Sequence, residues 1–198
     1  MTPRPYLSWS QMQLLERSPE KYREVYIEGK PSFTNAAMGF GSKVGKYLED
    51  DDLSGDAAID LVLSQMPRLQ IPEYEIHAIL PNGKQPVPLI AKLDSAQKDL
   101  SRVFEYKTGM TKWTQTKADA AGQLTFYATV IYLITKKLPD LELIWAQTER
   151  EEGSAVITFT GEIKRFKTQR HMGEIIRMMQ RMRDAQETIQ KMTEEALI

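Results

Sequence analysis

The segment RVFEYKTG, residues 102–109, carries two charged side chains, Glu105 and Lys107, two positions apart. Its valine, threonine and aromatic residues are typical of a β-strand. In a strand, side chains at positions i and i+2 point to the same face and lie about 7 Å apart along the chain. Glu105 and Lys107 should therefore share a face, with Tyr106 on the other. The pair is either an ordinary surface ion pair or one half of a metal-dependent active site.

A second carboxylate, Asp94, ends the strand-like segment LIAKLD, with ten residues between it and Glu105. A hairpin that joins the two segments would bring Asp94 beside Glu105 and Lys107. Neighbouring carboxylates repel each other unless a positive charge lies between them. A divalent cation relieves this repulsion, because carboxylates and waters satisfy the octahedral coordination of Mg²⁺. A nearby lysine can stabilise charge on a phosphate or help to deprotonate water, so the three residues suit phosphodiester hydrolysis.

The composition excludes several other kinds of metal site. The chain has no cysteine, which excludes a disulfide, a cysteine nucleophile and an iron–sulfur cluster. His77 and His171 are the only histidines, too few for a multi-histidine site. A bound metal would therefore be a hard cation held mainly by carboxylate oxygens, which favours Mg²⁺ or Mn²⁺.

The charged residues are unevenly distributed along the 198-residue chain. The net charge of −1 argues against a protein that coats nucleic acid through bulk charge. Residues 164–183, however, carry seven lysines and arginines against a single glutamate. This basic stripe is either a solvated helix face or a surface that grips nucleic acid at one place. Its first four basic residues are our candidates for DNA binding: Lys164, Arg165, Lys167 and Arg170.

The pattern of apolar, turn and capping residues predicts one α/β domain over residues 1–198, with a mixed sheet. The expected helices span residues 11–18, 43–52, 56–66 and 116–137, with an amphipathic helix from about residue 170. The expected strands span residues 73–80, 87–96 and 101–109, as an antiparallel meander, followed by 141–148 and 155–161. No apolar stretch approaches the roughly 20 residues of a membrane helix, and the first residues lack the apolar core of a signal peptide. We therefore expect a cytoplasmic protein.

The order of these pieces resembles the PD-(D/E)XK nuclease superfamily, specifically its RecB-type branch. That branch includes the RecB and AddAB nuclease domains and CRISPR-adaptation nucleases. In it an aspartate ends one strand, a D/E-x-K triplet lies in the next, and a Q-x-x-x-Y motif lies in the following helix. The similarity runs from Tyr6 to about Tyr132, and the residues at the motif positions are Asp94, Glu105, Lys107, Gln123 and Tyr127.

The resemblance implies a restriction-endonuclease-like domain, with a central mixed β-sheet flanked by helices, that cleaves DNA with Mg²⁺ or Mn²⁺. Asp94 and Glu105 would hold the metal, with Glu49 and the backbone carbonyl of Tyr106 as further ligands. Lys107 would orient or activate the attacking water. Gln123 and Tyr127 would position that lysine, the water or the DNA backbone; alternatively, they make only internal hydrogen bonds in a buried helix.

Two positions depart from the family pattern. The early family motif often carries a metal-binding histidine, and here GSKVGKYLE has Gly45 at that place. Glu49, one turn later, is either a replacement carboxylate or part of a solvated helix end. Iron–sulfur members have a Cys-Pro pair near the start, whereas this chain has Ser18-Pro19. We therefore expect no iron–sulfur cluster. Packing of the methionine-rich last helix should replace the cluster in holding the ends of the domain together.

Other residues near these motifs have weaker claims to a role. Lys112 and Trp113 are further candidates for DNA binding. They follow the D/E-x-K strand in a loop that should border the site, where the tryptophan could stack on a base. Glu73 and Glu75 are expected to face solvent. Alternatively, Glu75 lies at the edge of the metal site.

The sequence supports a metal-dependent DNA nuclease, with exonuclease-type end processing in recombination, repair or CRISPR adaptation. Three alternatives stay open. The first is a catalytically degenerate nuclease fold that binds DNA or a partner. The second is a nuclease that works beside a helicase, recombinase or CRISPR-adaptation protein. The third is an unrelated α/β protein with a chance motif.

Overall fold

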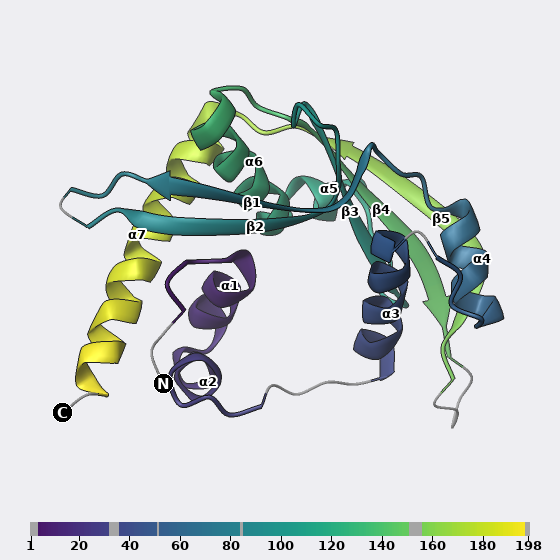
Figure 1. The fold of residues 1–198 in the computed structure, drawn as a ribbon, viewed down its shortest axis with the longest axis horizontal. Coiled ribbons are helices and arrows are strands. Elements are labelled where there is room, and N and C mark those ends of the chain that lie inside the picture. The colour runs from purple at the N-terminus through teal and green to yellow at the C-terminus, as the bar shows by residue number, and fades with distance from the viewer. Residues whose placement is uncertain (1–3, 32–35, 51, 84, 151–155, 197–198) are drawn as a thin grey trace.

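Five strands form one mixed sheet in the computed structural model, which describes residues 4–31, 36–50, 52–83, 85–150 and 156–196 (Figure 1). They lie in chain order: β1 (Ile71–Leu80), β2 (Val87–Ala96), β3 (Arg102–Gly109), β4 (Asp140–Glu149) and β5 (Thr158–Thr168). The first three strands are antiparallel, β3 and β4 are parallel, and β5 returns antiparallel to β4. The predicted meander and the restriction-endonuclease-like α/β class, with helices flanking a mixed sheet, are confirmed.

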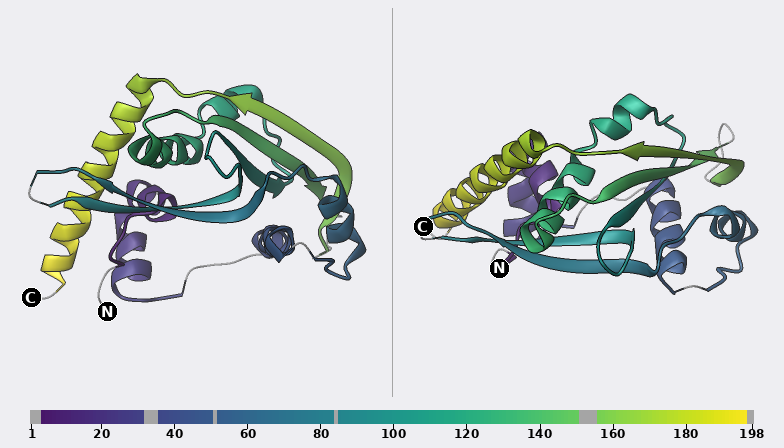
Figure 2. Two further views of the ribbon diagram at one scale, coloured as in Figure 1. Left: turned by 45° about the horizontal axis from the view of Figure 1, so that its top comes forward. Right: turned by 90° about the horizontal axis from the view of Figure 1, so that it is seen from above.

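The helices gather in two groups around this sheet (Figures 1 and 2). Around the β1–β2 hairpin lie α1 (Trp9–Arg17), α6 (Gly122–Thr135) and α7 (Met172–Glu195). Next to β3, β4 and β5 lie α3 (Ala36–Asp50) and α4 (Ala57–Gln65). The remaining helical segments are short: α2 (Pro19–Tyr22), the π-helical turn η1 (Arg23–Ile27) and α5 (Gln115–Asp119). No helix in the described ranges is both long enough and apolar enough to cross a membrane.

Strand β3 separates two hydrophobic cores. Val103 belongs to the core under α1, α6 and α7, whereas its neighbour Phe104 belongs to the core under α3 and α4. This alternation is what a central strand produces, because successive side chains point to opposite faces. Glu105 and Lys107 lie on the α6 face and Tyr106 on the α3 face, as the spacing in the sequence predicts.

Three predicted element boundaries are wrong. The helix expected over residues 116–137 is two helices, because the chain breaks at Ala120 and Ala121 and restarts at Gly122. Strand β5 was expected over 155–161 but spans Thr158–Thr168, since the alternating segment 162–168 pairs with β4. The helix expected from residue 43 begins at residue 36, and residues 51 and 151–155 lie outside the described ranges.

The two ends of the chain are tied together by α7. Its buried face consists of Ile175, Met178, Met182, Ala185 and Ile189. Arg181 on its exposed side makes a bidentate ion pair with Glu16 of α1, at 3.0 and 2.7 Å. Nearer the end of the helix, Arg23 pairs with Glu195 at 2.8 Å. The methionine-rich helix thus packs against the N-terminal segment.

The first turn of α6 lies directly on the indole of Trp9. A Cβ at Gly122 would lie 2.3 Å from Trp9 Cη2, and the Trp9 ring is 6.3 Å from that of Phe126. Only a glycine at position 122 leaves room for the tryptophan at this distance. The contact fixes the start of α6 against α1.

We expect Gly122→Ala to lower the melting temperature although alanine favours helix. The methyl group overlaps a packed indole, which costs about 1–3 kcal/mol, or roughly 2–4 °C per kcal/mol in a chain of this size. The matched control is Gly39→Ala in α3, where a Cβ meets nothing within 4 Å; it should be neutral or stabilising by up to about 1 kcal/mol. Differential scanning calorimetry of both variants tests the contact. Equal stability of the two would contradict it.

Candidate active site

The candidate site lies where β2 and β3 separate. The two strands pair at Ser95–Phe104 and Ala96–Val103, and no further pairing continues the ladder on the side of Asp94 and Glu105. Instead of bonding to a strand backbone, the N–H of Tyr106 donates to Oδ2 of Asp94 at 2.7 Å. The fork therefore places Asp94 and Glu105 at the same level on adjoining strands.

A chain of hydrogen bonds links this fork to α6. Lys107 makes an ion pair with Oε1 of Glu105, and its Nζ donates to Oε1 of Gln123 at 2.9 Å. The side-chain amide of Gln123 then donates to the hydroxyl of Tyr127 at 2.7 Å. Gln123 and Tyr127 lie one turn apart, so they share a face of α6. The structure thus brings Asp94, Glu105, Lys107, Gln123 and Tyr127 into one cluster.

Burial sets the electrostatics of the cluster. Burial, followed by the charge of Glu105, raises the pKa of Asp94 well above its usual range. Burial alone would favour a neutral Lys107, but the carboxylates of Glu105 and Asp94 outweigh it and raise the pKa of the lysine. Burial and the same two carboxylates also raise the pKa of Tyr127 well above its usual range. The cluster therefore holds a cationic lysine and a neutral tyrosine hydroxyl.

The donor set fits a hard divalent cation. Among the buried side-chain nitrogen and oxygen atoms of the described residues, Oε2 of Glu105 has no hydrogen-bond partner. Leaving a buried carboxylate oxygen unpaired is costly, and a cation would satisfy it. No group of three or more histidine, aspartate or glutamate side chains suited to a metal occurs in the described ranges. The two carboxylates of Asp94 and Glu105 are sufficient for Mg²⁺, which commonly binds one or two protein carboxylates and completes its coordination with water and phosphate oxygens.

A cavity of about 460 Å³ opens beside the fork, between α3 and the sheet; we call it the α3 cavity. Asp94 and Lys107 line it together with Gly41 and Gly45 of α3. A Cβ at Gly41 would lie 2.9 Å from Oγ1 of Thr108, so this glycine permits the close approach of α3 to β3. A Cβ at Gly45 meets nothing within 4 Å. Gly45, at which the family that the sequence resembles often has a histidine, therefore faces the α3 cavity with room for a side chain.

Glu73 is a site residue that the sequence reasoning missed. It is exposed, as expected, but it also lines the α3 cavity together with Asp94. The β1–β2 register, with Pro72 opposite Ser95 and Tyr74 opposite Leu93, places Glu73 opposite Asp94. Its φ of 28° is unusual for a residue with a side chain, which is a sign of strain. Counting outward from the PNGKQP turn would have paired positions 73 and 94.

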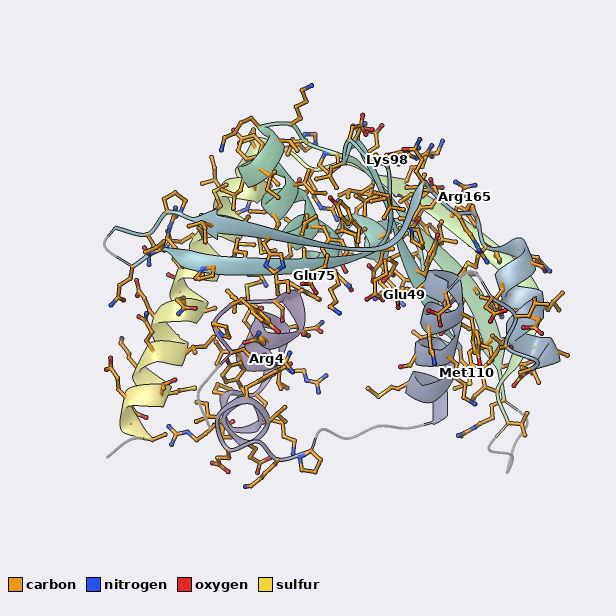
Figure 3. All side chains as sticks on the ribbon, in the orientation of Figure 1. Arg4, Glu49, Glu75, Lys98, Met110 and Arg165 are labelled. Carbon is orange, nitrogen blue, oxygen red and sulfur yellow. The ribbon has the colours of Figure 1, made fainter. Side chains whose placement is uncertain are left out.

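Glu49 and Glu75, both labelled in Figure 3, have no described hydrogen bond or ion pair with Asp94, Glu105 or Lys107. Glu49 is exposed at the end of α3 nearest the sheet, and the charge of Glu73 is the main cause of its raised pKa. It is thus a rim carboxylate rather than part of the buried pair. Glu75, the alternative considered from the sequence, pairs with His77 at 2.9 Å and with Lys92 at 3.7 Å.

The first two residues of the basic stripe lie on opposite faces of the sheet. Lys164 lies on the face of Lys107, because Lys107, Trp145 and Lys164 are in register across β3, β4 and β5. Its ammonium lies 5.9 Å from the Trp145 ring centroid and pairs with Glu162 at 2.8 Å. Arg165 points to the other face, where it holds the buried carboxylate of Glu142 at 2.6 and 3.0 Å.

Arg170 is not at the surface, contrary to our expectation. It is 3% exposed, and its guanidinium donates to Oγ1 of Thr125 at 2.7 Å and to the carbonyls of Ala118 and Ala121 at 3.2 Å. These carbonyls lie at the break between α5 and α6, so the arginine holds the two helices together. It is unavailable to DNA in this structure.

The remaining three candidates for DNA binding lie at the edge of the domain. Lys112 is exposed in the β3–α5 loop, and its neighbour Trp113 is half-buried against the α6 core. Lys167 is exposed near the end of β5, and its carbonyl accepts a hydrogen bond from Gln115 of α5 at 2.8 Å. None of the three contacts the Asp94–Glu105–Lys107 cluster by a described hydrogen bond or ion pair.

No protein-family model matches the chain, and no curated protein matches its sequence. Among solved structures, SSO0001 is similar with a TM-score of 0.45 and 12% identity, over 96% of this chain and 78% of that one. Rai1 of Scheffersomyces stipitis has a TM-score of 0.29 and 14% identity, over 83% of this chain and 44% of that one. Rai1 of Candida albicans, in complex with pU5-Mn²⁺, has a TM-score of 0.29 and 12% identity, over 82% of this chain and 43% of that one. The matches cover less than half of either Rai1 chain, and likeness at these scores carries no assignment of family or function.

We expect Mn²⁺ or Mg²⁺ to raise the melting temperature of the protein by a few degrees, because a cation that binds only the folded state stabilises it by mass action. Asp94→Asn should melt higher than the parent without metal, since it removes the charge that repels the neighbouring buried carboxylate of Glu105. It should also lose the shift that the metal produces. Differential scanning fluorimetry against metal concentration measures both effects. A full metal shift in the variant would exclude Asp94 as a ligand.

Proposed function

We propose that this protein is a Mg²⁺- or Mn²⁺-dependent deoxyribonuclease that hydrolyses phosphodiester bonds at the β2–β3 fork. The observation that carries the proposal is the buried, unpaired oxygen of Glu105 beside Asp94 and a cationic Lys107. Two neighbouring carboxylates, of which Glu105 is buried and Asp94 partly buried, cost free energy in the absence of a counter-charge, and active sites are where such an arrangement is retained. Asp94 and Lys107, the neighbours of Glu105, line an open cavity through which a substrate can reach the cluster.

Asp94 and Glu105 would hold the metal, with the carbonyl of Tyr106 as a further ligand and Glu49 at the rim. When bound, a divalent cation neutralises charge on the phosphate and lowers the pKa of water. Lys107 holds a positive charge next to that position, where it stabilises negative charge on the phosphate and orients the attacking water.

Gln123 and Tyr127 act through Lys107. The amide oxygen of Gln123 accepts from the ammonium, and the amide nitrogen is committed to the hydroxyl of Tyr127. This fixes the orientation of the amide, so its oxygen always faces the lysine. Both are therefore positioning residues for the ammonium of Lys107.

End processing of DNA in recombination, repair or CRISPR adaptation, beside a helicase, recombinase or adaptation protein, is the biological role that the sequence resemblance favours. The competing proposal is a degenerate module that binds DNA without cutting it. Gly45, where the family often has a histidine, is the observation that favours the module. The two differ in whether metal produces cleavage.

Lys107→Ala should lower the rate of metal-dependent DNA cleavage by about 10²–10³-fold, since it removes a preorganised charge from the reacting phosphate. End-labelled single- and double-stranded DNA, incubated with Mg²⁺, Mn²⁺ or EDTA, gives the rate and shows which end is attacked. The matched control is Lys98→Ala, an exposed lysine between β2 and β3 (Figure 3), which should cleave like the parent. Cleavage that survives in Lys107→Ala would refute the proposed site, and absence of cleavage by the parent would favour the module.

Gly45→His should tighten the binding of Mn²⁺. The glycine faces the same cavity as Asp94, with no atom within 4 Å of the position of a Cβ. An imidazole there adds a ligand that suits transition metals better than Mg²⁺. Isothermal titration calorimetry with both metals measures the effect, which should be larger for Mn²⁺. Gly39→His, on the same helix but not lining this cavity, is the control. An unchanged Mn²⁺ affinity would place the metal elsewhere.

A further inference from the structure

A second cavity, of about 340 Å³, lies on the other side of Asp94; we call it the α1 cavity. It is lined by the segment that leads into α1, by β2, and by Gln123 and Tyr127 of α6. Glu73 and Asp94 line both this cavity and the α3 cavity. The two cavities therefore adjoin at the carboxylate of the proposed active site, one on each side of it.

The lining of the α1 cavity combines cations, hydroxyls and aromatic rings. Arg4 and Lys92 supply positive charge, and the hydroxyls of Ser8 and Ser10 lie 3.1 Å apart. Tyr6 and Trp9 are further lining residues. Cations for phosphates together with aromatic faces for bases are the means by which proteins hold single-stranded nucleic acid.

Arg4 is held in place by the π-helical turn. Its guanidinium lies 5.3 Å from the centroid of the Tyr26 ring, and Tyr26 in turn lies 5.0 Å from the ring of Tyr22. Tyr22 is anchored by a hydrogen bond from its hydroxyl to Gln11 at 3.3 Å. Figure 3 shows Arg4 beside α1 and Glu49 on α3, on opposite sides of the space beneath β1 and β2. The arginine is thus positioned across from α3.

Trp9 gives the cavity a rigid wall. The indole is fixed between Gly122 and Phe126, yet it remains half-exposed and lines the cavity. A ring that is already ordered loses little conformational entropy when a ligand packs against it. The wall is therefore suited to a flat ligand such as a base or a sugar.

We propose that the α1 cavity is the subsite for the nucleotide next to the scissile phosphate, with Arg4 as the residue that contacts its phosphate. A single DNA strand then passes over Asp94 from one cavity into the other. This inference rests on the proposed nuclease function and adds to it the N-terminal residues that hold the strand. Each cavity has about the volume of a small-molecule site, which is enough for one nucleotide. A duplex is too wide to enter such a cavity, because its major groove alone measures about 12 Å across. The occupant is therefore an unpaired nucleotide.

The test is binding of a fluorescein-labelled oligothymidylate of about 12 nucleotides, measured by anisotropy in EDTA so that no cleavage occurs. Arg4→Gln should weaken binding about tenfold and reduce the slope of log K against log salt by about one, because one phosphate contact is lost. Ser10→Trp, which fills the cavity from an exposed position, should weaken binding to a similar extent. The matched control is Arg17→Gln, which removes the same charge from the exposed last turn of α1 and should bind like the parent.

The outcomes separate the subsite from the nuclease. Binding that depends on Arg4 and Ser10, without cleavage by the parent in any metal, supports the α1 cavity as a site for single-stranded DNA but refutes the proposed nuclease function. Metal-dependent cleavage by the parent, with binding unchanged in both variants, refutes the subsite and leaves the function standing. A hairpin duplex without single-stranded ends that competes as well as the oligothymidylate also refutes the subsite. Circular dichroism of each variant confirms that a loss of binding is not a loss of fold.

Discussion

The separation of β2 from β3 is the constraint on which the rest of this site depends. The backbone ladder between them stops at Ser95–Phe104, and the carboxylate of Asp94 takes the hydrogen bond from the N–H of Tyr106. A side chain thus satisfies a backbone donor that the partner strand would otherwise serve. The same bond holds Asp94 next to Glu105, at the place where the opened strands leave room for a substrate.

This arrangement gives up stability at the site. Glu105 is 1% exposed, and only one of its two oxygens is paired, with Lys107. The lysine cannot compensate both carboxylates, which is why the pKa of Asp94 is raised by burial and by its neighbour. Stability and metal binding are therefore linked: the feature that destabilises the free protein is the feature that would bind a cation.

Helix packing decides what surrounds the carboxylates. Gly41 lets α3 approach β3, and Gly122 lets α6 rest on Trp9. Between these two close approaches, Asp94 lines both the α3 cavity and the α1 cavity. Arg170 completes the frame, because its buried guanidinium binds the carbonyls at the break between α5 and α6 and so fixes the helix that carries Gln123. A residue that seemed suited to DNA thus supports the site from within.

The sequence by itself determined that five strands are present, though not the bounds of β5, and it identified the five members of the cluster. Period-two alternation is local, so the shared face of Glu105 and Lys107 follows from their spacing, and Gln123 and Tyr127 follow from one helical turn. Only the tertiary structure decided which basic residues are engaged within the protein, because Glu142 pairs with the exposed Arg165 and helix-end carbonyls bind the buried Arg170, and all of these partners are distant in the chain. It also decided that Glu73 lines the two cavities beside Asp94, since the pairing of positions 73 and 94 can be counted from the turn but the elements that enclose the cavities cannot. Local patterns fix the direction of a side chain, whereas its partners depend on which distant elements pack against it.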